Sequence, residues 1–336
     1  MKKSLLYLVA GILAALLPSF VHAGEITLTT SKAVGDSIVL KFYSAEFSGI
    51  TVEGATEKER LEDDQILYIK YILESQTVKV SGDFTYIDCG NNSLTALDVS
   101  KCTGLKSLYC GSNSLTALDV SGCPELTQLS CGNNPLTTLE VSNCPKLENF
   151  KCDGSSLTAL EVSNCPKLLL LYCRYSSLTT LEVNNCPKLK KIFCEYNSLT
   201  TLEFTDCPGL YDIYCQMNQI KGKAMDDLIA SLNDRSGDVI KGALLAIDLS
   251  DPGEGNVCTW PQVEAALRRG SIVYARKDQE WKKYPGSDPA GIDRTETGTG
   301  DVPAVIYDLE GRRSRELRPG INIVKTTGGK TVKVTR

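Results

Sequence analysis

Fourteen cysteines and a single histidine are the residues whose types could carry reactive or metal-binding chemistry in this 336-residue chain. Thirteen of the cysteines fall into two series with a constant spacing of 21 residues, and Cys258 stands outside both. The first series is Cys89, Cys110, Cys131, Cys152, Cys173, Cys194 and Cys215, and the second is Cys102, Cys123, Cys144, Cys165, Cys186 and Cys207. No C-x-x-C pair occurs, so the spacing gives no support to a metal site.

The two cysteine series raise the question of disulfides, which are common in secreted proteins. Equivalent cysteines on adjacent repeats would lie about 4.8 Å apart at Cα, within reach of a bridge. Their side chains would run parallel, however, which fits poorly with the required dihedral angle near 90°, and a series of seven leaves one thiol unpaired. We therefore expect buried free thiols in a tight core, with disulfides as the open alternative.

The only histidine, His22, lies in an N-terminal segment that reads as a targeting signal. A positively charged start, an apolar run over residues 5–17 and small residues before Gly24 predict a signal peptide over residues 1–23, with a membrane anchor as the alternative. The mature chain would contain no histidine, which excludes Ser-His-Asp and Cys-His catalysis and histidine metal sites. We expect no enzymatic activity, no catalytic residue and no cofactor.

The charge balance limits the classes of molecule that the protein could bind. Lys and Arg number 36 against 41 Asp and Glu, a net charge of -5, so no basic excess exists to neutralise the phosphates of a nucleic acid. Apolar residues make up 42% of the chain, as in an ordinary folded protein. We expect a monomer with no membrane span after removal of the signal, and a protein or glycan as partner.

Carboxylates recur at a second fixed position of the repeat. They are Asp98, Asp119, Glu140, Glu161, Glu182 and Glu203, beside a column of threonines. Like charges about 5 Å apart repel one another and raise each other's pKa, an effect that Lys146, Lys167 and Lys188 could relieve in part. A solvated face is the favoured interpretation, and a calcium site is the alternative. A carboxylate-based glycan hydrolase would need two paired acids about 5–10 Å apart in a cleft, which an open face does not supply.

The cysteines and carboxylates are positioned by a 21-residue unit, LxxLxCxxNxLxxLxVxxCPx, of which residues 126–146 are one complete copy. The LxxLxC half has the alternation of a short strand, so stacked units predict a parallel sheet with Leu, Leu and Cys in a common core. Asparagines three residues after the first cysteine can bond backbone groups at the turn; they are Asn92, Asn113, Asn134, Asn197 and Asn218. Ser155 and Ser176 replace this residue, and we expect these two turns to be held less firmly.

The repeat over residues 84–220 resembles the leucine-rich repeat family, and its nested halves resemble the bacterial IRREKO type. The resemblance implies an α/β solenoid, a right-handed array of about seven rungs that binds proteins or other macromolecules. Residues 24–83 are predicted to form a β-rich N-terminal cap and residues 221–283 an α/β C-terminal cap, followed by a linker over residues 284–302.

The last segment, residues 303–336, resembles the C-terminal sorting modules of the type IX secretion system of Bacteroidetes in its short β segments and glycines. The resemblance implies a secreted or outer-surface protein, with the periplasm as the alternative location. Whether the segment is cleaved stays open.

Outward-facing positions of the strand half supply the candidate site. They are small and polar in the first units and bulky in the last three. The predicted partner-binding residues are Leu170, Tyr172, Tyr175, Phe193, Tyr196, Tyr214 and Met217, edged by Arg174, Lys191, Glu195 and Asp212. An exposed aromatic cluster with a charged rim is typical of a recognition surface. The alternatives are that the chain's own C-terminal cap covers the patch, or that the protein is a purely structural component of the envelope.

Overall fold

The computed structural model describes residues 24–43, 49–63, 66–239, 241–287, 303–308, 313–314, 321–326 and 331–335. The predicted signal peptide and most of the predicted linker, residues 288–302, lie outside these ranges. The chain divides into two compact units, Met1–Ser177 and Leu178–Arg336, which are described separately below.

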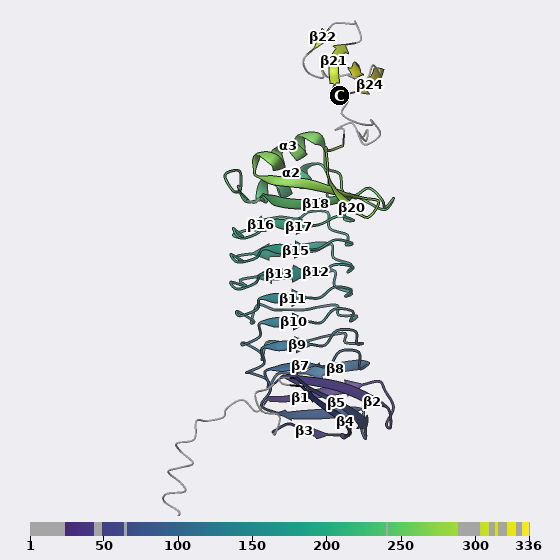
Figure 1. Cartoon of the computed structure of the whole chain (residues 1–336), viewed down its shortest axis with the longest axis vertical. Coiled ribbons are helices and arrows are strands. Elements are labelled where there is room, and N and C mark those ends of the chain that lie inside the picture. The colour runs from purple at the N-terminus through teal and green to yellow at the C-terminus, as the bar shows by residue number, and fades with distance from the viewer. Residues whose placement is uncertain are drawn as a thin grey trace, which may run out of the picture. The chain divides into compact units, whose positions relative to one another are not determined.

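The first unit is built on short parallel strands that repeat every 21 residues (Figure 1). These rung strands are β7 (Tyr86–Asp88), β9 (Ser107–Tyr109), β10 (Gln128–Ser130), β11 (Asn149–Lys151) and β13 (Leu170–Tyr172). Leu108 pairs with Leu129 and Leu129 with Phe150, so each apolar residue lies beside its own equivalent. Leu129 is 1% exposed and Phe150 is fully buried. The predicted solenoid with a leucine and cysteine core is therefore confirmed.

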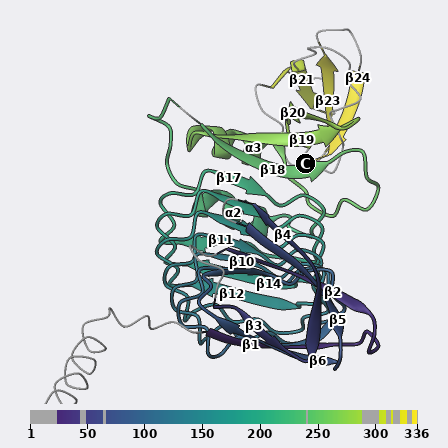
Figure 2. The same cartoon turned by 60° about the horizontal axis from the view of Figure 1, so that its bottom comes forward.

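Longer antiparallel strands precede the rungs and close the apolar end of the first one (Figures 1 and 2). One sheet has the order β3-β6-β1-β8 and consists of β3 (Thr51–Glu53), β6 (Thr77–Gly82), β1 (Gly24–Thr30) and β8 (Leu94–Asp98). The others extend the rung sheet from β7 in the order β2 (Ser37–Tyr43), β5 (Ile66–Leu73) and β4 (Ala55–Asp63). The β4–β5 hairpin was not foreseen, because the highly charged sequence of β4 lacks an alternation of apolar and polar residues. A further strand, β12 (Ala159–Ser163), belongs to the second half of a repeat.

Asparagine side chains tie consecutive turns together, as the sequence predicts. The amide nitrogen of Asn134 donates to the carbonyl oxygens of Cys131 (2.9 Å) and Cys110 (3.0 Å), and its oxygen accepts the Leu115 N–H (3.0 Å). At the two serine positions longer and fewer bonds replace this network: the hydroxyl oxygens of Ser155 and Ser176 lie 2.9 Å apart, and the Ser176 hydroxyl accepts the Ser155 N–H (3.2 Å) and lies 3.4 Å from the Arg174 carbonyl oxygen. A hydroxyl is too short to reach both neighbouring turns.

The second unit carries parallel strands of the same kind, continued by the C-terminal cap. The strands are β14 (Thr180–Asn184), β15 (Lys191–Phe193), β16 (Phe204–Thr205), β17 (Asp212–Tyr214), β18 (Gly242–Asp248), β19 (Ser271–Lys277) and the antiparallel β20 (Glu280–Lys283). The helices are α2 (Lys223–Ser231) and α3 (Trp260–Arg268). Helix α3 begins after Thr259, whose N–H donates to the Gln262 side chain (2.8 Å) in a capping box.

The asparagine ladder continues into this cap through a residue outside the repeat. Asn256 donates to the carbonyl oxygens of Cys215 (2.7 Å) and Ala246 (2.8 Å), and its oxygen accepts the Ile220 N–H (2.7 Å). The cap therefore meets the last rung with the same hydrogen bonds that join one rung to the next.

The predicted linker does not begin at Tyr284. Tyr284 is 6% exposed and its N–H donates to the Val273 carbonyl (2.9 Å), and Ser287 exchanges backbone bonds with Cys258 and Trp260 (2.9 Å each). Residues 284–287 thus belong to the cap, because the proline and glycine that suggested a linker instead direct the chain back onto α3.

The C-terminal segment forms a four-stranded antiparallel sheet with the order β22-β21-β23-β24. Its strands are β22 (Arg313–Ser314), β21 (Pro303–Asp308), β23 (Ile321–Thr326) and β24 (Thr331–Thr335). Within the described ranges, no helix has the length and apolar character that crossing a membrane requires.

Candidate functional site

The fourteen cysteines are free and buried. Burial raises the pKa of the Cys131, Cys123 and Cys258 thiols to about 12, so they carry little thiolate at neutral pH. Thiolate is the nucleophile and metal ligand, and these side chains therefore act as small apolar core groups. In the part of the chain that the structure describes, no group of three or more His, Cys, Asp or Glu residues could hold a metal ion.

The acidic column lies on an exposed face, and its electrostatics differ from the prediction. Hydrogen bonds from Ser100 hold the pKa of Asp98 below its ordinary value, and Ser121 does the same for Asp119. The expected mutual rise in pKa is therefore wrong at these two residues, because local donors outweigh the repulsion. Lys146 pairs with Glu125 (2.6 Å) and not with the acidic column.

On the outward-facing side of the rung strands, which we call the strand face, the second unit places two of the predicted aromatic residues in contact. The rings of Phe193 and Tyr214 stack with centroids 4.4 Å apart, and Trp281 of β20 meets Tyr214 edge-on at 6.5 Å. Lys191 and Asp212 form an ion pair of 2.8 Å on the same strands. Trp281 was missed because it lies in the cap. Its one signal was a lone aromatic residue in the polar sequence EWKK.

The strand face of the first unit carries a second group of predicted residues. The Tyr172 ring lies between two cations, 5.0 Å from the Lys151 ammonium and 5.7 Å from the Arg174 guanidinium. Arg174 in turn pairs with Asp153 (3.2 Å). Leu170 is half-buried on the same strand. The two cations restrict the Tyr172 ring and give it a polar environment.

The predicted aromatic patch is less exposed than expected. Tyr175 is 58% exposed, whereas the other six aromatic or apolar members, on β13, β15 and β17 and the turns after them, are half-buried. Glu195, expected on the charged rim, is only 6% exposed. It directly follows a ladder cysteine, where the first rungs have glycine; a Cβ at Gly132 would lie 2.7 Å from the Asp153 carbonyl oxygen. Glu195 is buried there, whereas Asp153 and Arg174 at the same repeat position of earlier turns are half-buried and reach the strand face.

The residue two positions after each cysteine of the first series has an unusual backbone conformation. Every residue there has a positive φ: Asn91 (58°), Ser112 (56°), Asn133 (54°), Gly154 (67°), Tyr175 (50°), Tyr196 (58°) and Met217 (59°). Glycine and asparagine adopt this left-handed conformation readily, whereas a bulky side chain is disfavoured by about 1–2 kcal/mol. The last three members of the column, Tyr175, Tyr196 and Met217, therefore occupy backbone sites that suit smaller residues.

The backbone of Met217 is bound to the C-terminal cap. Its N–H donates to the Glu254 carboxylate (2.9 Å), which also accepts the N–H groups of Asp248 (2.7 Å) and Asn256 (2.8 Å). Burial nevertheless raises the pKa of Glu254 above its ordinary value. This carboxylate ties the cap loop to the last rung.

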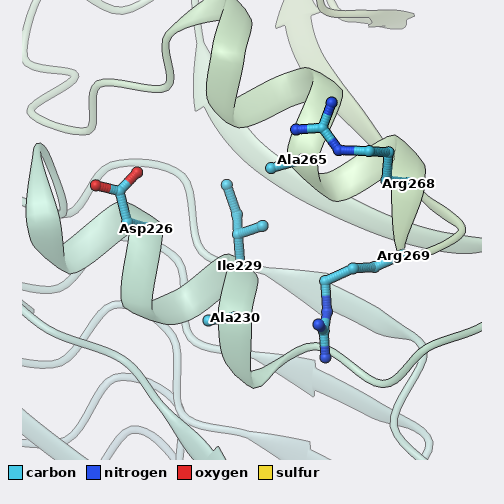
Figure 3. A pocket seen from close by; sticks show the side chains of 6 residues that line it. All are labelled: Asp226, Ile229, Ala230, Ala265, Arg268 and Arg269. Atoms are coloured by element: carbon cyan, nitrogen blue, oxygen red, sulfur yellow. The ribbon is translucent and has the colours of Figure 1, made fainter.

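A groove of about 400 Å³ lies between α2 and α3, with Asp226 at one end and Arg268 and Arg269 at the other (Figure 3). Its charged groups are engaged within the fold. Gln262 donates to Asp226 (2.7 Å), and Arg269 donates to the Leu232 carbonyl (2.8 Å). Arg268 pairs with Glu264 at 3.7 Å. The groove is therefore a packing feature of the two helices and not a candidate site.

Sequence comparisons identify repeats in two stretches. Residues 103–143 match the family model described as Leucine Rich repeats (2 copies), and residues 74–106 match the LVIVD repeat. The comparison with curated proteins gives no match.

Three solved structures illustrate the similarity of fold. The leucine-rich repeat domain of APL1B is 19% identical, with 36% of this chain and 38% of that one covered and a TM-score of 0.31. The functional domain of InlJ from Listeria monocytogenes, which includes a cysteine ladder, is 19% identical over 79% of this chain and 93% of that one, with a TM-score of 0.25. The LRIM1/APL1C complex is 15% identical over 56% and 49%, with a TM-score of 0.29.

This chain spans less than two fifths of the APL1B domain and about half of the LRIM1/APL1C chain. With TM-scores at this level, none of these structures is a guide to what the chain binds. Residues 103–143 are thus similar to leucine-rich repeats, and the parallel pairing of strands one 21-residue period apart continues from this stretch to the next turn of the first unit.

Proposed function

We propose that this protein binds a protein partner non-covalently through strand-face side chains of each unit, Tyr175 in the first and Tyr196 and Met217 in the second, and performs no chemistry of its own. The observation that carries the proposal is the left-handed backbone under these three side chains, with φ between 50° and 59°. Four other turns of the same chain have Asn, Ser or Gly at this position. The fold does not need bulk there, and strained residues are typically retained at functional positions.

The surrounding side chains suit protein recognition. Tyr175 is 58% exposed, and the nearby Tyr172 ring is flanked by Lys151 and Arg174. Tyrosine and arginine are enriched among the residues that dominate binding energy at protein interfaces. A half-buried ring that is already fixed loses little side-chain entropy when it binds, which favours affinity.

The proposal extends to the location and type of the protein. The signal-like residues 1–23 support secretion, and the strands of the 303–336 segment support the resemblance to a sorting module. We place the chain among the IRREKO-type repeat proteins at the outer cell surface, with burial of the thiols as a further argument against catalysis.

The test is a triple variant in which Tyr175, Tyr196 and Met217 are changed to Asn. If the side chains serve binding, the variant folds with unchanged or higher stability, because each Asn relieves up to about 1 kcal/mol of backbone strain. Urea unfolding followed by circular dichroism measures stability. Pull-down from envelope or host extracts with the immobilised mature protein, followed by mass spectrometry, measures partner capture, which the variant should lose.

Ser112→Asn, at the same repeat position in an early turn, is the matched control and should change neither property. A triple variant that is strongly destabilised would show that the three side chains pack in the core of the fold. Retained capture of the same partner would remove this surface from the binding site. Either result contradicts the proposal.

A further inference from the structure

We propose that a polar hollow on the strand face of the first unit binds a neutral glycan. The hollow has a volume of about 260 Å³ and spans the turns after β7, β9, β10 and β11. It lies on the first rungs, whose outward-facing residues are mostly small and polar. None of its lining residues is Tyr175, Tyr196 or Met217 of the proposed protein-binding surface.

Small residues form the hollow. Ser130 occupies the column in which β9 has Tyr109 and β13 has Tyr172, and Gly111 and Gly132 follow the ladder cysteines. The short side chain of Ser130 therefore leaves a gap between Tyr109 and Lys151, at a repeat position where the fold accepts tyrosine. Packing does not require a serine there.

One wall of the hollow is an aromatic ring held in place. Tyr109 packs against Tyr86 with centroids 5.1 Å apart, and its hydroxyl hydrogen-bonds to the Gln128 side chain. The ring is half-exposed, so the face of a sugar can contact it. Restricting both rings before binding lowers the entropic cost of capturing a ligand.

The remaining lining groups donate and accept hydrogen bonds. Asn91 and Asn133 are exposed amides at the left-handed turn, and Ser112 and Ser130 supply hydroxyl groups. Apart from the tyrosine wall, no apolar side chain lines the hollow. Such a surface matches a ligand whose many hydroxyl groups both donate and accept.

The charges favour a neutral ligand. Asp88 pairs with Lys41 (2.8 Å) and also accepts the Gly90 N–H (3.0 Å), and Asp153 pairs with Arg174 (3.2 Å). Both carboxylates are thus neutralised and held in fixed directions. The lining itself has two carboxylates and one ammonium, that of Lys151, so it does not select an anion, and carboxylates already bound to cations are poor ligands for a metal.

An extended peptide fits this hollow less well than a glycan. Backbone groups at its floor are already used between turns, as in Ser112 N–H to Gly132 (2.9 Å) and Asn133 N–H to Asp153 (2.7 Å). A peptide could therefore not add as a strand, and it would find no apolar pocket for a side chain. The volume is below the roughly 300–1,000 Å³ typical of sites that enclose a whole small ligand, so we expect one sugar ring of a longer chain to be seated.

The test uses the mature full-length protein in native gels that contain laminarin, yeast mannan, xylan or amylopectin, with polygalacturonate as the anionic comparison. At least one neutral polysaccharide should retard the wild type, and titration calorimetry with its hexasaccharide should give saturable binding. Ser130→Tyr fills the hollow with a side chain that neighbouring rungs accept, and should weaken binding at least tenfold.

Asn133→Gly removes a lining amide at a residue whose φ is 54°, a conformation that glycine adopts without strain, and should also weaken binding. Thr137→Tyr, on an exposed position outside the hollow, is the matched control and should bind as the wild type does. Unchanged thermal unfolding of all three variants shows that the fold is intact.

No retardation by any neutral polysaccharide, equal retardation of Ser130→Tyr and wild type, or retardation by polygalacturonate alone would overturn the proposal. Selection from a random peptide library of peptides that bind wild type and not Ser130→Tyr would assign the hollow to a peptide and overturn it as well. None of these variants changes Tyr175, Tyr196 or Met217, so the outcome is separate from that for the protein-binding surface.

Discussion

The buried thiols make the fold sensitive to alkali. Burial raises their pKa above the ordinary value of 9.0, so each thiol holds its proton more tightly in the folded chain than in the unfolded chain. Their contribution is therefore constant below about pH 8 and is lost as the pH rises through the unfolded pKa toward the folded pKa. We expect the protein to unfold cooperatively between about pH 9 and pH 10 while its surface lysines are still charged.

The magnitude follows from five thiols whose folded pKa is raised to about 11 or 12: Cys102, Cys123, Cys131, Cys144 and Cys258. At pH 10 ionisation in the unfolded chain costs the fold on the order of 1 kcal/mol for each thiol, which amounts to several kcal/mol for the five. At pH 9 the same five cost only about 2 kcal/mol. Because domains are stable by about 5–15 kcal/mol, the loss at pH 10 is comparable to the whole stability. The pKa of Cys89, Cys110, Cys152, Cys207 and Cys215 is shifted in the same direction.

Urea unfolding at half-unit steps from pH 7 to pH 10.5, in the presence of a phosphine reductant, measures this loss. Circular dichroism reports unfolding, and absorbance near 240 nm reports thiolate formation in the same sample. The two signals should change together, because thiolate forms only in the unfolded chain. A native circular dichroism spectrum at pH 10.5, or thiolate formation while the spectrum is still native, would refute the assignment of these cysteines as deeply buried free thiols.

Two pairs of substitutions, each a variant and its control, test which interactions hold the turns together. Asn134→Ala should cost about 3 kcal/mol in urea unfolding, because a buried N–H and a buried carbonyl lose their partner, whereas the exposed neighbour Asn133→Gly should cost less than about 0.5 kcal/mol. Equal losses would contradict the ladder. Leu129→Asp should abolish the native circular dichroism spectrum of the array because it buries a charge at a 1% exposed position, whereas Leu139→Asp should fold because Leu139 is half-buried.

Features that repeat could be predicted from the sequence. Leu108, Leu129 and Phe150 occupy one environment because each is one period from the next, so the core, the strand register and the asparagine ladder follow from spacing alone. Features that occur once could not. Asn256 completes the ladder from a loop with no periodic neighbour, and Trp281 approaches Tyr214 from the cap.

The left-handed turn position was missed although its signal is present. Asn91, Asn133 and Gly154 share one column, and these residue types at a fixed repeat position are typical of positive φ. Tyrosine carries no such local signal, so exposure of Tyr175 was predicted and its backbone conformation was not. The Asn and Gly residues at this repeat position indicate a positive φ for every turn. Once the positive φ is known, tyrosine at the same position is recognised as unusual.

Residues at equivalent positions of the other repeats therefore show which residue types the fold itself requires, and departures from them indicate function. Where a column suits small residues, as at the left-handed turn, the bulky Tyr196 is one of three exceptions and costs conformational energy. Where a column accepts tyrosine, as at Tyr109 and Tyr172, Ser130 is its one small member and leaves a hollow. In both cases the fold would accept the commoner choice, so the exceptions are not explained by packing. We infer that the strand faces of the repeats carry recognition surfaces of two kinds, one made by adding side chains and one by omitting them.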